Sequence, residues 1–161
     1  MAIDLTHNSP EILDMLNELL ARTDDLSDAM AGVAAVLESA VEGAFADEAD
    51  PETGTAWDAL SAVTLGLRPH RAGGQLLQDT GRLAASITSD SGADFAQVGT
   101  NAIYAGTMQF GAARGAFGKS SRGTPLPWGD IPARPFMGIS PDDESDILAI
   151  LSDHLSGPLA P

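Results

Sequence analysis

The sequence predicts an α+β fold, a small and mostly antiparallel sheet packed by a long N-terminal helix and a C-terminal helix, with a long glycine-rich loop. Apolar residues recur every three or four positions at 9–48 and at 141–156, which predicts the helices. The region at 80–139 alternates apolar and polar residues and contains many glycines, which predicts a hairpin and loops. We expect residues 1–161 to form a single domain, because a chain of about 150 residues supports one core.

The N-terminal helix is predicted to begin at Ser9, whose hydroxyl can cap it, with Pro10 at the first helical position. The apolar pattern pauses at residues 23–25 and then resumes as far as Phe45. Carboxylates fall between the apolar positions of this second stretch, so we expect one face of the helix to enter the core. Acids, proline and glycine at 47–55 then predict a loop.

The strand evidence is strongest around residues 83–100. Leu83, Ala85 and Ile87 alternate with small or polar residues, Asp90-Ser91-Gly92 is a turn signal, and residues 95–99 are again typical of a strand. This pattern predicts a β-hairpin, and the apolar residues at 102–110 predict a short helix beside it.

The last third of the chain is predicted to contain a loop, an extended segment and a helix. Glycines, prolines and basic residues at 111–129 favour a long surface loop. Residues 131–139 contain Pro132 and Pro135, which would confine them to an edge strand or a strand end. The C-terminal helix is predicted to start with a capping box at Ser140 and to stop before Gly157-Pro158.

Charge is distributed unevenly along the chain. The formal net charge is −15, and residues 1–60 contain 14 acids and one base, whereas residues 61–137 contain four acids and seven bases. Autonomous nucleic-acid binding requires a surplus of basic residues, so we expect none. We also expect no membrane span, because no uninterrupted apolar run approaches about 20 residues.

Composition and motifs give little indication of catalysis. The chain contains no cysteine, which excludes disulfides and thiol nucleophiles, and its three histidines show no metal-ligand spacing. We therefore expect no enzyme activity, no cofactor and no metal site. A remote alternative is a small acidic hydrolase that uses the acidic loop at 47–52 near Trp57.

Several short motifs occur in an order that resembles the phage virion morphogenesis family, the tail completion proteins of Mu-like and P2-like phages. The residues that carry this resemblance are Asp50-Pro51, Trp57, Thr80-Gly81-Arg82-Leu83, Gly99-Thr100-Asn101 with Tyr104-Ala105, Gln109-Phe110-Gly111 and the block IPARPFMGIS at 131–140. The resemblance covers most of the chain, from the long helix to the last one.

The resemblance implies a structural virion protein that completes the phage tail at its head-proximal end and joins the tail to the head as a ring subunit. The implied partners are other copies of the chain, the tail tube or tail terminator, and the neck or connector proteins. The protein would be made in the host cytoplasm and would end in the virion, at the neck or tail end. A head-closure or portal adaptor protein of the neck remains an alternative.

Four basic residues are the candidate partner contacts. We predict that Arg114, Lys119 and Arg122, in the predicted loop, meet an acidic face of a neighbouring subunit or protein. We predict that Arg134, held between two prolines, forms a bidentate pair with a carboxylate. That carboxylate comes either from the start of the C-terminal helix, at residues 142–146, or from a neighbouring subunit.

Overall fold

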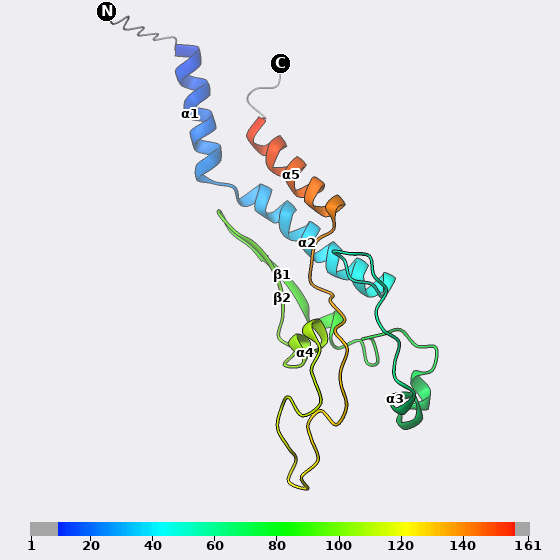
Figure 1. The fold of residues 1–161 in the computed structure, drawn as a ribbon. Helices are drawn as coiled ribbons and strands as arrows, with labels where there is room; N and C mark the ends of the chain where they lie inside the picture. Colours follow the sequence, from blue (N-terminus) through cyan, green and yellow to red (C-terminus); the bar gives the residue numbers. More distant parts are fainter. Residues whose placement is uncertain (1–9, 157–161) are drawn as a thin grey trace, which may run out of the picture.

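The computed structural model describes residues 10–156, so the predicted cap at Ser9 and the predicted stop at Gly157-Pro158 lie outside the described residues. The elements in chain order are α1 (Pro10–Asp24), α2 (Ser27–Asp47), α3 (Ala62–Leu67), two short 3₁₀ turns (Pro69–Arg71 and Ala84–Ser86), β1 (Ile87–Ser91), β2 (Ala96–Thr100), α4 (Ala105–Phe110) and α5 (Pro141–Ser156) (Figure 1). These helices and the antiparallel two-stranded sheet confirm the predicted α+β class.

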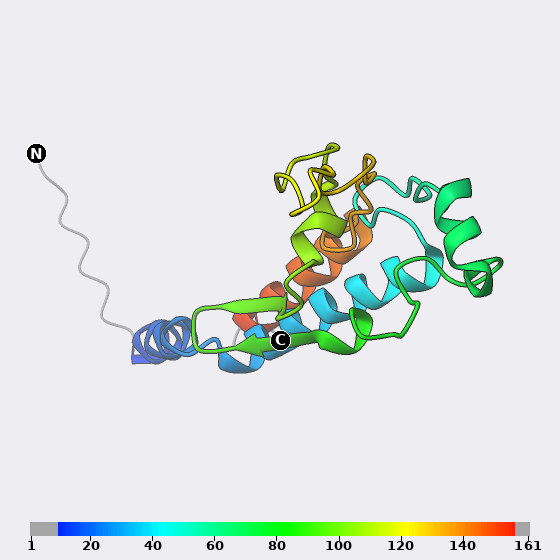
Figure 2. The ribbon, with the colours of Figure 1, turned by 90° about the horizontal axis from the view of Figure 1, so that it is seen from below.

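The predicted helical region at 9–48 consists of two helices that meet at Asp25 and Leu26. The Asp25 carboxylate accepts a hydrogen bond from the backbone N–H of Ser27 (3.0 Å), which satisfies one of the free N–H groups at the start of α2. Hydrogen bonds from Ser27 hold the pKa of Asp25 below its ordinary value. Because the chain turns here, α1 extends beyond the rest of the molecule (Figures 1 and 2).

Helix α2 is the central helix and packs against both the hairpin and α5 (Figure 1). Contrary to the expectation from the sequence, this helix is long and apolar enough, by length and composition alone, to cross a membrane. Its apolar composition has another explanation in this fold. The helix buries Ala29, Val33, Ala34, Ala40, Val41, Ala44 and Phe45 inside the protein.

The predicted hairpin is present, but it is shorter than predicted. Residues 84–86 form a 3₁₀ turn instead of a strand, and the strands pair from Ile87 with Thr100 to Ser91 with Ala96. Asp90 and Ser91 therefore belong to β1 rather than to the turn, which is closed by the N–H of Gly92 donating to the carbonyl of Phe95 (2.9 Å). The turn lies slightly later in the chain than its composition suggested.

The core joins the end of α2 to segments that are distant in sequence. The ring of Phe45 packs edge-on against the ring of Trp57, with 6.0 Å between the ring centroids. It also packs against the ring of Phe136 in a tilted arrangement, with 5.3 Å between the centroids. Leu83 and Ala105 belong to the same buried cluster, and Ile87 and Val98 of the hairpin pack against it. Apolar burial and aromatic contacts of this kind are the main source of stability in a domain without disulfides.

The predicted edge strand at 131–139 is wrong. Within the described residues, this segment is extended but makes only an isolated bridge, between Ile131 and Ala112. Pro132 and Pro135 have no N–H to donate, which prevents a continuous ladder. The segment is instead held by side chains, as the next subsection describes.

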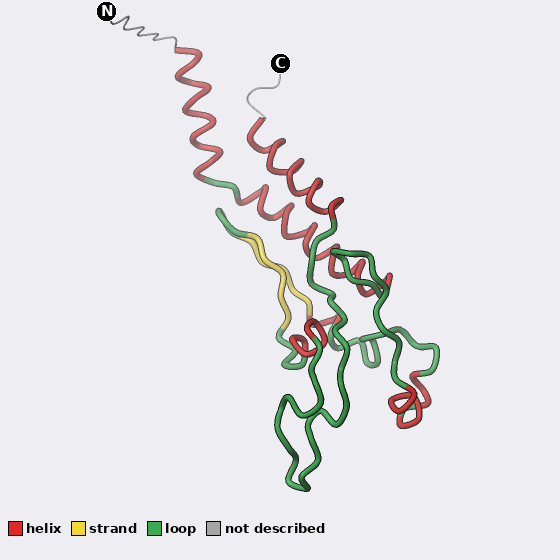
Figure 3. The backbone as a smooth tube through the Cα atoms, viewed as in Figure 1, coloured by secondary structure: helices red, strands yellow, loops and turns green. Residues whose placement is uncertain are grey.

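Residues 111–129 form the predicted long loop, which projects from the body below α4 (Figures 1 and 3). We call these residues the projecting loop. Its two sides are hydrogen-bonded to each other, since the N–H of Phe117 donates to the carbonyl of Leu126 (2.7 Å) and the N–H of Leu126 donates to the carbonyl of Gly118 (2.8 Å). The loop is thus an irregular hairpin without a regular ladder.

Helix α5 begins with the predicted capping box. The N–H of Asp143 donates to the hydroxyl of Ser140 (3.1 Å), and the N–H of Ser140 donates to the carboxylate of Asp143 (2.8 Å). The helix packs on α2 at Gly32, where an added Cβ would lie 3.3 Å from Cγ2 of Ile150. A small residue at this position therefore allows the two helices to approach closely.

Candidate interaction surfaces

A groove of about 750 Å³ lies between α3, α4 and the end of the projecting loop together with the residues that follow it. Its apolar lining includes Leu60, Val63, Leu67, Tyr104, Met108 and Trp128. Four of these side chains are exposed to solvent: Val63, Leu67, Tyr104 and Trp128. Exposed apolar side chains that gather around one hollow are typical of an interaction site.

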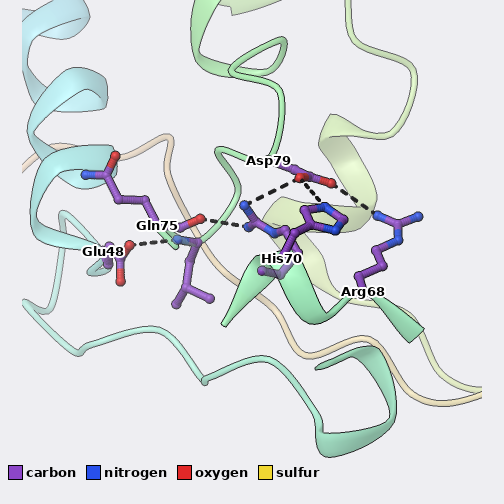
Figure 4. Close-up of polar contacts among 7 residues, drawn as sticks. Glu48, Arg68, His70, Gln75 and Asp79 are labelled. Atoms are coloured by element: carbon purple, nitrogen blue, oxygen red, sulfur yellow. Dashed lines mark hydrogen bonds and ion pairs between the residues drawn. The ribbon is translucent and has the colours of Figure 1, made fainter. Parts of the chain in front are cut away.

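Asp79 gathers three basic side chains at the edge of this groove (Figure 4). Its carboxylate lies 3.4 Å from Nη1 of Arg68, 3.3 Å from Nε2 of His70 and 3.7 Å from Nη1 of Arg71. Arg68 and His70 are exposed, whereas Arg71 is buried. Since one carboxylate faces two arginines, this edge of the groove keeps a positive charge.

Backbone contacts hold the cluster in place. Nη2 of Arg71 donates to the carbonyl of Gln75 (2.7 Å), and the N–H of Leu76 donates to Oε1 of Glu48 (2.7 Å), at the end of α2 (Figure 4). Leu76 itself is buried in the core. The connection between α3 and β1 is therefore fixed to the central helix, which fixes the position of the arginines beside the groove.

Arg134 also lines the groove, but its guanidinium is turned into its own subunit. Nε and Nη2 both donate to the carbonyl of Asp58 (2.9 and 2.7 Å), and Nη2 also donates to the carbonyl of Ala59 (3.3 Å). The acceptors in this subunit are backbone carbonyls, so the predicted pairing with a carboxylate at 142–146 is wrong. Burial lowers the pKa of Arg134, and the nearby Asp58 partly opposes this effect.

The extended segment around Arg134 is held by groups that sequence reasoning missed. The side-chain oxygen of Gln109 accepts from the N–H groups of Phe136 (2.9 Å) and Met137 (3.0 Å), and its nitrogen donates to the carbonyl of Met137 (2.8 Å). The indole N–H of Trp57 donates to the carbonyl of Pro135 (2.7 Å). We call this arrangement around Arg134 the arginine junction. Gln109 and Trp57 both belong to the motifs that carry the family resemblance. Their place in those motifs was the only indication in the sequence that they have a structural role.

Gly111 shows how closely the chain approaches itself at this junction. Its φ is +71°, and an added Cβ would lie 2.7 Å from the carbonyl oxygen of Ile131 and 2.8 Å from the nitrogen of Ala133. A side chain at this position would therefore clash with the backbone of Ile131 and of Ala133. The glycine of the Gln109-Phe110-Gly111 motif is therefore needed where α4 meets the segment at 131–133.

Arg114, Lys119 and Arg122 are all exposed in the projecting loop. The backbone N–H of Arg114 donates to the Asp130 carboxylate (2.7 Å), and Lys119 forms an isolated bridge with Pro125. The structure thus presents these three basic side chains at the surface, apart from Arg134, which is buried. Phe117 of the same loop is exposed as well.

The acidic segment at 47–52 shapes a turn. The Asp50 carboxylate accepts from the N–H of Glu52 (2.9 Å) and from the hydroxyl of Thr53 (2.9 Å), while the N–H of Asp50 donates to the carbonyl of Thr55 (2.9 Å). Across the part of the chain that the structure describes, no group of three or more metal-ligating side chains gathers. These hydrogen bonds give Asp50 a structural role in the turn.

Comparison with known proteins points to one group of phage proteins. The sequence model of the phage virion morphogenesis family matches residues 7–156. The chain is similar to the "Putative capsid assembly protein G" of Escherichia phage Mu, at 37% identity over 79% of this chain and 78% of that protein. It is also similar to the "Mu-like prophage FluMu G protein 2" of Haemophilus influenzae, at 37% identity over 92% of this chain and 91% of the relative. No solved structure matches the chain.

Proposed function

The chain belongs to the phage virion morphogenesis family, and from this premise we propose that it completes the phage tail at its head-proximal end and joins the tail to the head. Family membership places the protein in virion structure or assembly. The finer proposal is supported by the ordered motifs, which the fold uses to build one local structure. The arginine junction brings together residues from several of these motifs: Trp57, Gln109, Gly111 and the block at 131–140.

The protein would act as a ring subunit at the neck or tail end of the virion. Charge is segregated on it, since the acidic residues concentrate in the helices and the basic residues lie around the groove and on the projecting loop. When complementary surfaces lie at different places on one subunit, they form head-to-tail contacts, and such contacts close into a ring if the rotation permits. The proposed partners are other copies of the chain, the tail tube or tail terminator, and the neck proteins.

A second candidate is a head-closure or portal adaptor protein. The name of the phage Mu relative supports it, because that protein is described as a putative capsid assembly protein. Both candidates describe a structural role in the virion, and neither requires catalysis. They differ in the structure to which the protein binds first.

Deletion of the gene from the phage that encodes it, followed by electron microscopy of the lysate, tests the proposal. We expect DNA-filled heads and separate tails, and we expect purified protein to restore infectivity when it is first incubated with the tails and the excess is removed. Restoration after incubation with the heads alone, together with heads that leak DNA, would favour the adaptor. Normal joined particles from the deletion phage would contradict both.

A further inference from the structure

Helix α1 presents an amphipathic surface outside the core. Leu13, Leu16 and Leu20 are all exposed and occupy positions i, i+3 and i+7, which lie on one face of a helix. Helices that bind in grooves use anchors at this spacing. The 15 residues of α1 include four acids and one base, so the helix as a whole is acidic.

The groove beside α3 has the complementary character. Its walls expose Val63, Leu67 and Trp128. Apart from Arg134, whose guanidinium is turned into its own subunit, its charged lining consists of three arginines and two aspartates. The surplus of positive charge is opposite in sign to that of α1. The volume of about 750 Å³ lies within the range of sites that enclose drug-sized ligands, which is sufficient for several apolar side chains.

The position of α1 separates it from the groove of its own subunit. The helix lies at one end of the molecule, and α3 lies at the other end in both views (Figures 1 and 2). Within its own subunit α1 contacts α5, but this contact leaves Leu13, Leu16 and Leu20 exposed. The groove of a second copy combines apolar walls with the opposite charge.

We propose that α1 of one subunit docks in the groove of a second copy of the chain, with Leu13, Leu16 and Leu20 against Val63, Leu67 and Trp128. The contact is heterologous, so each subunit gives its helix to one neighbour and receives a helix from another. This inference rests on the proposed self-association in a ring and names the surfaces that carry it. The complementary charges set the register of the helix and speed the encounter.

Two single variants separate the two halves of the contact. Leu16→Glu changes an exposed position of α1, and Val63→Glu changes an exposed wall of the groove, so neither disturbs the core. We expect each variant to weaken self-association by about 100-fold or more, the scale of losing a central apolar anchor, as measured by sedimentation. Leu148→Glu on α5, also exposed, is the matched control and should associate like the parent.

Mixing the two variants tests the direction of the contact. The Leu16→Glu chain keeps its groove and the Val63→Glu chain keeps its helix, so we expect the mixture to form a 1:1 heterodimer and nothing larger. A symmetric contact between two α1 helices would give no heterodimer. That result, or variants that assemble like the parent, would overturn the proposal.

A disulfide trap tests the same contact when association is weak. The chain has no cysteine, so a Leu16→Cys/Val63→Cys double variant introduces only the two intended thiols. Since the two positions lie at opposite ends of one subunit, oxidation should give a ladder of covalent oligomers rather than an internal bridge. The control Leu16→Cys/Leu148→Cys should give no ladder. Absence of a ladder from the first variant would overturn the inference, whereas the proposed function fails only if the deletion phage makes normal joined particles.

Discussion

One arginine and a set of three basic residues that ends about a dozen positions before it have opposite surroundings. Arg134 at the arginine junction is 6% exposed, and its guanidinium is committed to the backbone carbonyls of Asp58 and Ala59. Arg114, Lys119 and Arg122 of the projecting loop are exposed. Arg134 stabilises the fold, whereas the three loop residues leave their charge available to a partner.

The difference shows that basic character along a sequence does not by itself mark a contact surface. A buried guanidinium that satisfies carbonyl oxygens acts through hydrogen bonds, and its loss leaves those acceptors unpaired in the interior. An exposed cation acts through its field, which salt screens over about 8–10 Å. Matched substitutions in the two regions should therefore separate stability from association.

The largest expected difference is between two phenylalanines. Phe136→Ala at the arginine junction should lower the free energy of unfolding by about 3–5 kcal/mol, because Phe136 is 1% exposed and its removal leaves a cavity. Phe117→Ala in the projecting loop, where the ring is 60% exposed, should change it by no more than about 0.5 kcal/mol. Urea unfolding measures both. Equal losses would show that the loop belongs to the same cooperative core.

Two glycines sharpen the comparison, because both have positive φ. Gly111→Ala and Gly118→Ala share the backbone strain, at φ +71° and +87°, but only the Cβ at position 111 would meet other atoms within 4 Å. We expect Gly111→Ala to cost about 1–3 kcal/mol more than Gly118→Ala, the range for forced overpacking. A thermal or urea midpoint measures this difference. Identical midpoints would contradict the close approach at 131–133.

Arg134→Lys tests the hydrogen bonds of the guanidinium. Lysine keeps a positive charge but cannot reproduce the fork that holds two carbonyls, so we expect a loss of about 1.5–3 kcal/mol in urea unfolding. Arg122→Lys is the exposed control and should leave stability unchanged. If Arg134→Lys is as stable as the parent but yields unattached heads and tails, the arginine serves a neighbouring subunit instead.

The smallest effect on stability is expected from the projecting loop. Replacing Arg114, Lys119 and Arg122 together with serine should change the unfolding free energy by less than about 0.5 kcal/mol, because all three side chains are exposed. The same variant should assemble up to about 10-fold more slowly at low salt and show a smaller salt dependence. Light scattering during assembly measures the rate. Assembly at the parental rate at low ionic strength would show that the projecting loop does not contact a partner through these residues.

Local patterns in the sequence predicted the helical regions at 9–48 and 141–156 and the presence of the hairpin. The helix predicted at 141–156 has those bounds in the structure, and the hydroxyl of Ser140 and the carboxylate of Asp143 form its capping box as expected. Such features depend on residues within a few positions of each other, so their chemistry can be read along the chain. The motif order likewise indicated the family, because it depends on identity and spacing alone.

Tertiary structure alone decided how residues 131–139 and Arg134 are used. The segment was predicted as an edge strand, but whether extended backbone joins a ladder depends on which donors and acceptors lie beside it. Gln109 and Trp57, distant in the chain, supply those partners here. The acceptors of Arg134 are carbonyls more than 70 positions away, and no local spacing encodes them. The groove has the same origin, since its walls come from separate segments that only the fold brings together.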